Sequence, residues 1–510
     1  MDIVTLIAFA AAYVLAQISF MHFFQLNSYS PSAQMRWMDK NIGKWLIHPI
    51  IFVIAVLGFA FKPISLLTPL SLFWGAYLAR PKKAKKPLVY TKRVQRMFLT
   101  EAIICALAIT LAAVLSGIRA VIFVSLVLYL LAPLTVIAAN FINKPVERAV
   151  NKHFINDAKK ILKACDDLTV IGVTGSYGKT SVKYYLNTLL KAKYNVLMTP
   201  ESYNTPMGVV MTIRGKLKAT HEIFICEMGA KKVGEIKEIC DIVHPKHGII
   251  TSIGPQHLET FKTLDNVKST KFELCDALPP DGLLFLNGDD ENVMSYNKKP
   301  DAITYSMSSG DYTAFDISVS EKGTAFSVKA PSGDIGTFTT RLIGRHNVLN
   351  ITGAIAVSHT LGISMTELKP QVRRLECVPH RLQLIDKGNA LVIDDAYNSN
   401  PSGTKAALDT LALITGFKIL VTPGMVELGT KQDECNYIFG KNAAEVCDFV
   451  ILVGKRQTES IKRGLDDAAY PADKIFIADN IGEALTKAYG LNSHEQKKII
   501  LLENDLPDNY

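Results

Sequence analysis

The sequence has no paired cysteines. Its eight cysteines are scattered singly along 510 residues, and no two of them form a C-x-x-C motif. Isolated cysteines in a chain of this length are typical of reduced core thiols, so the sequence favours neither a disulfide framework nor a zinc site. We therefore expect the soluble part of the protein to lie in the cytosol.

Acidic residues are scarce in the first third of the chain. Residues 1–163 contain 19 Lys and Arg but only 5 Asp and Glu, whereas the remainder contains 37 and 42. The basic surplus therefore belongs to the N-terminal part, and the larger part is mildly acidic. Because binding to a nucleic-acid backbone needs a basic face on the working domain, this distribution argues against nucleic acid as a partner.

Long apolar runs fill the same N-terminal third, and a membrane span needs about 20 such residues. The runs are Ile3–Phe20, Ile103–Ile118 and Ala120–Asn143, which carry no charge, and Trp45–Ala79, which is apolar apart from His48 and Lys62. The Lys62-Pro63 step predicts that the last run is two short spans meeting at a turn, with a re-entrant hairpin as the alternative. Lys62 is the only charged side chain near the middle of a run, which favours an anchor over a transport pathway.

A basic loop orients these runs. The stretch RPKKAKKPLVYTKRVQRMF contains eight cations: Arg80, Lys82, Lys83, Lys85, Lys86, Lys92, Arg93 and Arg96. The positive-inside rule places this loop in the cytoplasm. Counting from it gives five spans of the lipid bilayer, with an external N-terminus and a cytosolic C-terminus. Anionic lipid headgroups could also bind the loop, although orienting the helices is a sufficient explanation.

The rest of the chain alternates apolar runs with helical patterns, which predicts an α/β fold with parallel sheets. The expected strands are Leu168–Val173, Ile223–Met228, Gly248–Ile253 and Gly282–Leu286, then Ala390–Ile393, Lys418–Val421, Phe449–Val453, Lys474–Ile477 and Ile499–Leu502. Residues 301–343 alternate differently and predict a small antiparallel insertion. The second group of strands lacks a G-x-G-x-x-G fingerprint, so we do not expect a dinucleotide site there.

A phosphate-binding loop follows the first of these strands. In TGSYGKTS, residues 174–181, Gly175 and Gly178 allow backbone N–H groups to curl around phosphates. Lys179 offers a positive charge to the β and γ oxygens, and the Thr180 hydroxyl can bind Mg²⁺ at a helix N-terminus. The pattern departs from the common Walker spacing because Val173 stands where that pattern has glycine. A strand, a glycine turn, Lys-Thr and a helix still predict nucleotide binding, with a plain strand–helix turn as the alternative.

Six further stretches accompany this loop. They are EMGA (Glu227–Ala230), IGPQHLETF (Ile253–Phe261), STKFEL (Ser269–Leu274), GRHNVLN (Gly344–Asn350), DDAYNSNP (Asp394–Pro401) and GMVELG (Gly424–Gly429). Together with the loop they resemble the Mur ligase family of ATP-dependent amide-bond-forming enzymes. Within it they look like the MurF branch, which joins D-alanyl-D-alanine to UDP-MurNAc-tripeptide in bacterial peptidoglycan synthesis. The resemblance extends from Leu168 to the C-terminus.

The resemblance implies a domain organisation. A central P-loop ATPase domain would span 168–380, and a C-terminal Rossmann-like α/β domain would span 381–510. The remaining parts are a helical transmembrane bundle over 1–145 and an amphipathic connector over 146–167. Such a protein would be a multi-pass protein of the bacterial cell membrane with cytoplasmic catalytic domains.

The resemblance also implies roles for individual residues. Around the nucleotide it assigns Gly175, Ser176, Gly178, Lys179, Thr180, Ser181, Asn347 and Arg381, with Asn347 reading adenine and Arg381 reaching the transferred phosphate. It assigns two Mg²⁺ ions to Thr180, Glu227, His257 and Lys271. Lys271 would carry a carbamate, which turns a cation into an oxygen ligand; a solvated helix lysine is the alternative. The family usually has glycine where His380 stands.

The substrates would meet at the junction of the two domains. Tyr203, Asn204, Thr205 and Ser252 would line the acceptor side, while Asp395, Asn398 and Asn400 would face the incoming amine. The implied catalytic groups are Lys179, His257, Lys271 and Arg381. A carboxylate would attack the γ-phosphate of ATP, and an amine such as that of D-Ala-D-Ala would then attack the acyl phosphate. Closure of the two domains would bring the reactants together.

The N-terminal third is where the sequence departs from the family. The MurF branch holds the UDP end of its substrate with a soluble domain before the P-loop, and here that place is taken by apolar runs. The acceptor would be UDP-linked muropeptide held by the remaining domains, or a membrane-borne carboxylate such as a lipid-linked muropeptide or a uronic-acid glycan. A rival from another class is a membrane scaffold or transporter whose ATPase-like domain only senses nucleotide.

Overall fold

The computed structural model describes residues 2–40, 42–80, 86–201, 203–320, 322–397, 399–493 and 495–505. The chain divides into two compact units, which we call the helical unit (Met1–His153) and the α/β unit (Phe154–Asp505). Lys82, Lys83 and Lys85 of the basic loop lie outside the described residues.

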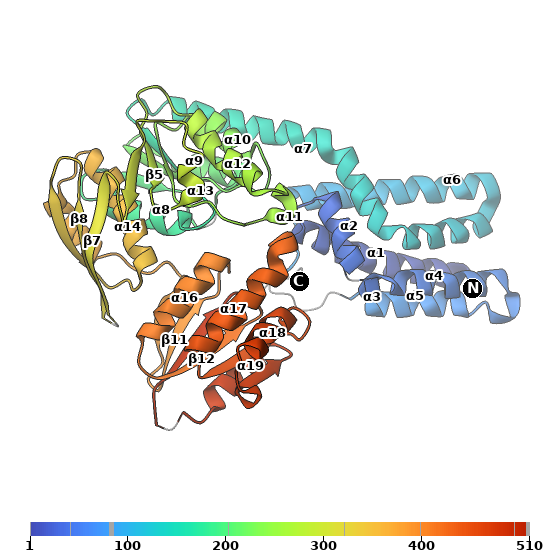
Figure 1. Cartoon of the computed structure of the whole chain (residues 1–510). Coiled ribbons are helices and arrows are strands. Elements are labelled where there is room, and N and C mark those ends of the chain that lie inside the picture. Colours follow the sequence, from blue (N-terminus) through green and yellow to red (C-terminus); the bar gives the residue numbers. More distant parts are fainter. Residues whose placement is uncertain are drawn as a thin grey trace. The chain divides into compact units, whose positions relative to one another are not determined.

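The helical unit consists of helices of very different lengths (Figure 1). They are α1 (Asp2–Leu26), α2 (Pro31–Lys40), α3 (Ile42–Trp45), α4 (Ile47–Ala60), α5 (Leu67–Leu78), α6 (Lys92–Leu130) and α7 (Ala132–Lys163). Within the described ranges, α1 and α6 are long and apolar enough to cross a membrane, and α4 is a shorter apolar helix. A bundle of five spans is therefore not established by length and composition.

The breaks between these helices follow the backbone chemistry. The Lys62–Ile64 segment is a single 3₁₀ turn between α4 and α5, as the Lys-Pro step predicts. Gly117 interrupts α6 with φ 72° and ψ −165°, which glycine tolerates because it has no Cβ. The expectation of one continuous helix over 120–143 is wrong, because α6 ends at Leu130 and α7 begins at Ala132. Pro133 lies in the first turn of α7, where its missing N–H costs nothing.

Polar groups are also buried in the helical unit. The His48 Nδ1 and the Tyr129 hydroxyl lie 2.9 Å apart, and the Gln17 amide donates to the Thr135 hydroxyl at 2.5 Å. Glu101 of α6 is only 2% exposed. It precedes the uncharged run that begins at Ile103, so it lies outside the middle of that run.

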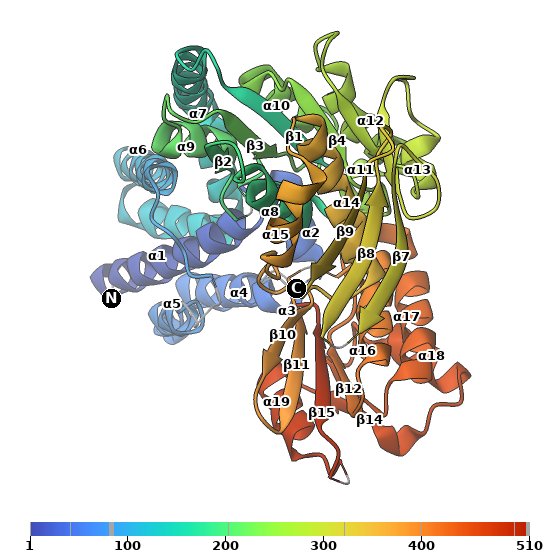
Figure 2. The same ribbon diagram turned by 90° about the vertical axis from the view of Figure 1, so that its left-hand side faces the viewer.

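The α/β unit begins in the second half of α7, which runs without interruption across the position where the connector was expected to start. Its larger sheet has nine strands in the order β2-β3-β1-β4-β5-β6-β7-β8-β9. Their bounds are β1 Thr169–Thr174, β2 Val196–Met198, β3 Ile223–Glu227, β4 His247–Ile250, β5 Leu284–Asn287, β6 Ile303–Ser306, β7 Tyr312–Ser320, β8 Gly323–Lys329 and β9 Ile335–Thr340. Strands β1 to β6 pair in parallel, and β7, β8 and β9 pair antiparallel (Figure 2). The expected antiparallel segment therefore extends the same sheet.

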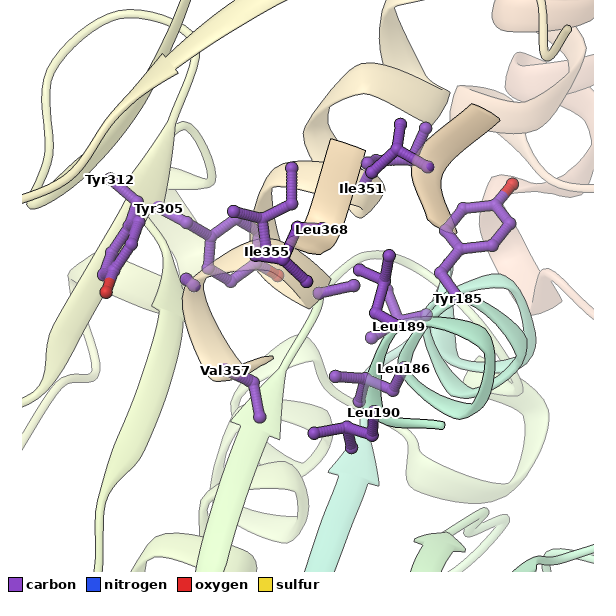
Figure 3. Packing of buried hydrophobic residues seen from close by; sticks show 14 of the residues in the cluster. Tyr185, Leu186, Leu189, Leu190, Tyr305, Tyr312, Ile351, Ile355, Val357 and Leu368 are labelled. Carbon is purple, nitrogen blue, oxygen red and sulfur yellow. The ribbon is translucent and has the colours of Figure 1, made fainter. Parts of the chain in front are cut away.

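Both faces of the parallel part are buried, which explains the nearly continuous apolar sequence of its strands. In β1, Ile171 and Val173 pack on one face, whereas Val170 packs on the other. The first face is covered by α8 (Lys179–Leu190), α14 (Arg345–Thr360) and α15 (Met365–Arg373), and Figure 3 shows this packing between α8 and α14. The second is covered by α9 (Pro206–Lys216), α10 (Glu235–Val243) and α12 (Leu264–Asp276).

The smaller sheet has six strands in the order β10-β11-β15-β12-β13-β14. Their bounds are β10 Gln383–Asp386, β11 Ala390–Asp395, β12 Phe417–Thr422, β13 Phe449–Val453, β14 Ile475–Ala478 and β15 Lys498–Glu503. Strands β11 to β15 pair in parallel, and the short β10 pairs antiparallel with β11. One face is covered by α16 (Pro401–Leu413), α17 (Gln432–Val446) and α18 (Glu459–Asp467), and the other by α19 (Ile481–Gly490). This arrangement confirms the predicted α/β class.

Candidate active site

The phosphate-binding loop connects β1 to α8, as its sequence predicts. Gly175 has φ 150° and Gly178 has φ 80°, a backbone conformation that side-chain-bearing residues rarely adopt. A Cβ at Gly175 would collide with the Thr251 hydroxyl, and one at Gly178 would lie 2.8 Å from the Asn350 side-chain oxygen. Both glycines are therefore required by space as well as by conformation.

Lys179 folds back over this loop. Its ammonium donates to the carbonyl oxygens of Gly175 at 2.7 Å and Ser176 at 2.9 Å. Burial lowers the pKa of Lys179 to about 8, although the nearby Glu227 charge opposes the shift and the Arg381 charge adds to it. The ammonium thus marks the place where the oxygens of a phosphate would sit, held by carbonyl groups that a ligand could replace.

Glu227 lies at the carboxyl end of β3, beside the start of α8. Its Oε1 accepts hydrogen bonds from the Thr180 hydroxyl at 3.2 Å and the Asn204 amide at 3.1 Å. The side chain is 1% exposed, and burial raises its pKa, but the charges of Lys183 and Lys179 outweigh burial and the net pKa is lowered. Glu227 is therefore an ionised carboxylate next to the Thr180 hydroxyl.

Lys183 is a second buried cation that sequence reasoning missed. Its Nζ lies 2.9 Å from Glu227 Oε2 and donates to the Glu201 carbonyl at 2.5 Å, with the side chain fully buried. The available signal was its spacing, since Lys183 follows Lys179 by four residues and so shares one face of α8. Lys183 links the carboxylate to the segment that carries Tyr203 and Asn204.

Residues 251–257, after β4, wrap around the phosphate-binding loop. The Ser252 hydroxyl accepts from the Tyr177 N–H at 3.1 Å, and the Ser176 N–H donates to the Ser252 carbonyl at 2.6 Å. The Ser176 hydroxyl contacts the Gly254 carbonyl at 3.1 Å. Ser252, which the sequence assigned to the acceptor side, is thus part of the frame that shapes the loop.

His257 lies at the end of this segment and does not contact Glu227 directly. Its Nδ1 is 2.7 Å from Glu427 Oε2, a residue of the GMVELG stretch after β12. Burial lowers the pKa of His257, and the hydrogen bond to Glu427 opposes that shift. The GMVELG motif did not by itself predict a role for Glu427, and its contact with His257 is seen only in the structure.

Lys271 is buried on α12. It is 2% exposed, and no hydrogen-bond or ion-pair partner for its ammonium occurs in the described part of the chain. Burial lowers its pKa well below the usual value, and the Lys179 charge adds to the effect. A neutral amine is the form that reacts with carbon dioxide, so Lys271 is not the solvated helix lysine that was the alternative.

Asn347 lies on α14 and Ser181 on α8, the two helices that pack together over the first face of the larger sheet. The Asn347 amide donates to the Ile343 carbonyl at 2.9 Å, and its oxygen accepts from the Tyr185 hydroxyl at 2.8 Å. Ser181 lies in the first turn of α8. Asn347 is therefore held in one orientation.

Arg381 lies between two residues with left-handed backbones. His380 has φ 59° and Leu382 has φ 49°, which explains why glycine suits position 380. The His380 Nδ1 lies 2.8 Å from Asp394 Oδ2, so a hydrogen bond helps to hold this backbone conformation. The Arg381 guanidinium stacks on the Tyr397 ring at 4.5 Å.

The aspartates of DDAYNSNP hold this junction. Asp395 Oδ1 accepts from the Leu382 N–H at 3.1 Å, and Asp395 pairs in register with Glu503 of β15. Burial raises the pKa of both carboxyl groups, and the pKa of Glu503 is raised well above its usual value, with the neighbouring Asp395 charge adding to the effect. Glu503 is a further residue that the sequence analysis did not single out.

The other residues assigned to the substrates have local roles. Asn400 caps α16 by accepting from the Gly403 N–H at 2.8 Å, and Thr205 caps α9 by accepting from the Gly208 N–H at 3.3 Å. Tyr203 is 39% exposed and is thus available to a ligand. Asn398 lies outside the described residues.

The residues present fit a divalent cation at Thr180 and Glu227. A hydroxyl and an ionised carboxylate are oxygen ligands of the kind that Mg²⁺ prefers, with phosphate oxygens and water completing its shell. Within the described ranges no group of three or more His, Cys, Asp or Glu side chains could hold a metal.

Comparisons with known proteins identify the family. A model of the Mur ligase middle domain matches residues 173–358, and a model of the Mur ligase glutamate ligase domain matches residues 380–502. A UDP-N-acetylmuramoyl-tripeptide–D-alanyl-D-alanine ligase of Escherichia coli is 32% identical over 315 residues, which cover 60% of this chain and 69% of that protein. The chain belongs to the Mur ligase family.

Other relatives of this Mur ligase agree. The ligase of the same name from Bacillus subtilis is 33% identical over 56% of this chain and 63% of its own length. A crystal structure of MurF from Acinetobacter baumannii superposes with a TM-score of 0.65 and 26% identity, covering 71% of this chain and 78% of that one. MurF ligase from Thermotoga maritima, in complex with ADP, has a TM-score of 0.59 and 26% identity, covering 69% and 80%. The matched family models begin at residue 173, after the helical unit, so the N-terminal region differs from the UDP-binding domain of the branch.

Proposed function

We propose that this Mur ligase forms an amide bond between a muropeptide carboxylate and the amine of D-alanyl-D-alanine or another short peptide, with ATP cleaved to ADP and phosphate. The carrying observation is the placement of the Thr180 hydroxyl 3.2 Å from the Glu227 carboxylate beside Lys179 at the phosphate-binding loop. The names of the relatives support the substrates, and the ADP complex of a relative supports the nucleotide.

The proposed mechanism assigns each charge to a residue. Lys179 leaves the Gly175 and Ser176 carbonyls and binds the β and γ oxygens, while Arg381 compensates charge on the transferred group. The acceptor carboxylate attacks the γ-phosphorus, ADP leaves, and the amine then attacks the acyl phosphate and releases phosphate. Asn347 contacts adenine.

Mg²⁺ would be held by Thr180 and Glu227, and when bound it would compensate charge on the phosphates. We propose His257 and a carbamate on Lys271 as ligands of a second ion. The burial of Lys271 supports the carbamate, because burial lowers the pKa of its amine and the neutral amine is the form that reacts with carbon dioxide.

We also propose that the helical unit lies in the bacterial cell membrane with the α/β unit on its cytoplasmic side. The support is a strip of large apolar side chains on α6 that the protein leaves mostly exposed: Leu107 is 67% exposed, Leu111 60%, Val114 78% and Leu115 71%. Water would oppose such a surface, and hydrocarbon would favour it.

That surface favours a second candidate acceptor. With a helical unit before the family match, a lipid-linked muropeptide could be held at the bilayer instead of a UDP-linked one. A uronic-acid glycan is a third carboxylate of the same kind. The amide chemistry is the same for all three.

The experiment is a phosphate-release assay on detergent-solubilised full-length protein with ATP and Mg²⁺. UDP-MurNAc-tripeptide, lipid-linked muropeptide and a uronic-acid glycan are each offered with D-Ala-D-Ala and with other short peptides. We expect release that depends on both an acceptor and an amine, with the preferred acceptor identifying the substrate. Phosphate release that is the same with and without the acceptor and the amine would favour a nucleotide-sensing scaffold instead.

A further inference from the structure

Glu427 contacts a residue from the other half of the α/β unit. It lies in the loop after β12 of the smaller sheet, and its carboxylate reaches His257, which follows β4 of the larger sheet. The His257 Nδ1 to Glu427 Oε2 distance is 2.7 Å, and the two side chains are 18% and 30% exposed. Lys231 approaches the other Glu427 oxygen at 3.9 Å, too far for a hydrogen bond.

The backbone on both sides of this contact is unusual. His257 has φ 52° and Glu427 has φ 63°, and neither is glycine. A left-handed backbone conformation is unfavourable for such residues, and it persists where the surrounding structure or function requires it. Two strained residues therefore aim their side chains at each other from different sheets.

The contact defines the form of the imidazole. A carboxylate has only acceptor oxygens, so the ring nitrogen that faces it must carry the hydrogen. In the neutral imidazole this leaves Nε2 with a free lone pair, which is the form that binds a metal. Histidine ligands commonly donate their other N–H to a carboxylate, which fixes the ring orientation.

We propose that Glu427 is a positioning residue that holds His257 with Nε2 ready to bind a divalent cation. The inference rests on the proposed function, because there His257 is a metal ligand. The inference adds that a residue next to the smaller sheet helps to assemble a metal site next to the larger sheet. Because coupling between two equilibria is reciprocal, cation binding and the contact between the domains then favour each other.

The test is Mn²⁺ binding to the full-length protein with saturating ADP, followed by electron paramagnetic resonance. Loss of a carboxylate behind a histidine ligand typically weakens metal binding about 10- to 100-fold, and we expect this for Glu427→Ala. Glu427→Gln keeps an acceptor oxygen but loses the charge, so we expect a smaller loss. Glu445→Gln, an exposed carboxylate on α17, is the matched control and should bind Mn²⁺ like the wild type.

A second readout separates positioning from folding. The ¹⁵N shifts of His257 should report a hydrogen on Nδ1 in the wild type and a mixture of tautomers in Glu427→Ala, with unchanged circular dichroism. Unchanged Mn²⁺ affinity in Glu427→Ala would overturn the inference. If His257→Ala weakens Mn²⁺ binding and Glu427→Ala does not, only the inference fails; if no acceptor supports phosphate release while both variants lose Mn²⁺, the ligase proposal fails and the inference stands.

Discussion

The two units of this protein treat apolar side chains in opposite ways. In the α/β unit, Phe224 and Leu186 are fully buried between sheet and helices. In the helical unit, Leu111 and Val114 are as apolar but are mostly exposed. Burial in the protein interior removes apolar side chains from water and so stabilises the α/β unit. The exposed apolar side chains of the helical unit are removed from water only if the unit lies in a non-aqueous environment such as a bilayer.

The largest expected effect is the loss of a buried aromatic side chain. Phe224→Ala should lower the free energy of unfolding of the α/β unit by about 3–5 kcal/mol, because it leaves a cavity in addition to the lost transfer free energy. Chemical denaturation measures the change. Leu111→Ala in the helical unit is the counterpart, and it should leave the same transition unmoved; a similar loss in both would remove the contrast.

A charge placed on each exposed apolar surface tests the surroundings directly. Leu111→Arg should disfavour membrane insertion by about 2.5–3.5 kcal/mol, the cost of an arginine in the middle of a span. Met211→Arg, at a 57% exposed position of the α/β unit, should change stability by less than about 0.5 kcal/mol. The share of protein that resists carbonate extraction from membranes provides the measurement, and equal behaviour of the two variants would contradict a membrane location.

Lys179→Ala should affect only the α/β unit. It removes a charge aimed at the transferred phosphate, and we expect a loss of at least ~10²-fold in turnover, or about 2.7 kcal/mol of barrier. Phosphate release is measured beside membrane extraction, which should not change. Near-normal turnover would remove Lys179 from the mechanism.

The smallest effect is the pH dependence of stability from Asp395 and Glu503. Their pKa values are raised in the folded protein, so their contribution is fully present below about pH 4, the range of unfolded carboxyl groups, and is lost as pH rises through the folded values. Lys179 acts oppositely, because its folded pKa of about 8 lies below the unfolded value of 10.5 and stability is regained above pH 8.

Glu503→Gln isolates the carboxyl pair. The glutamine cannot ionise, so the free energy of unfolding measured from pH 5 to 8 should fall less steeply than in the wild type. The difference should be about 1.4 kcal/mol for each unit by which the folded and unfolded pKa values of Glu503 differ. Ser399 donates to Glu503 at 2.7 Å and can donate to the glutamine oxygen as well, which keeps the fold. Parallel pH curves for the two proteins would contradict a raised pKa of Glu503 in the folded protein.

Most of the sheet architecture was predictable because buried parallel strands have continuous apolar sequences. Every strand expected from such a run is present within a few residues. The strands missed were β2, which has three residues, and β10, a short antiparallel edge strand. Neither is long or apolar enough to stand out from a loop.

The site was predictable where a motif is local. Gly175, Gly178, Lys179 and Thr180 act through a single turn, so their spacing alone implies a phosphate-binding loop. The sequence likewise determined which unit carries the basic surplus and which runs are apolar enough for a bilayer. Only the tertiary structure decided that Lys183 forms an ion pair with Glu227, that Glu427 contacts His257 and that Glu503 lies beside Asp395 in the sheet. These partners are far apart in the chain, and strand order, which periodicity does not encode, brings them into contact.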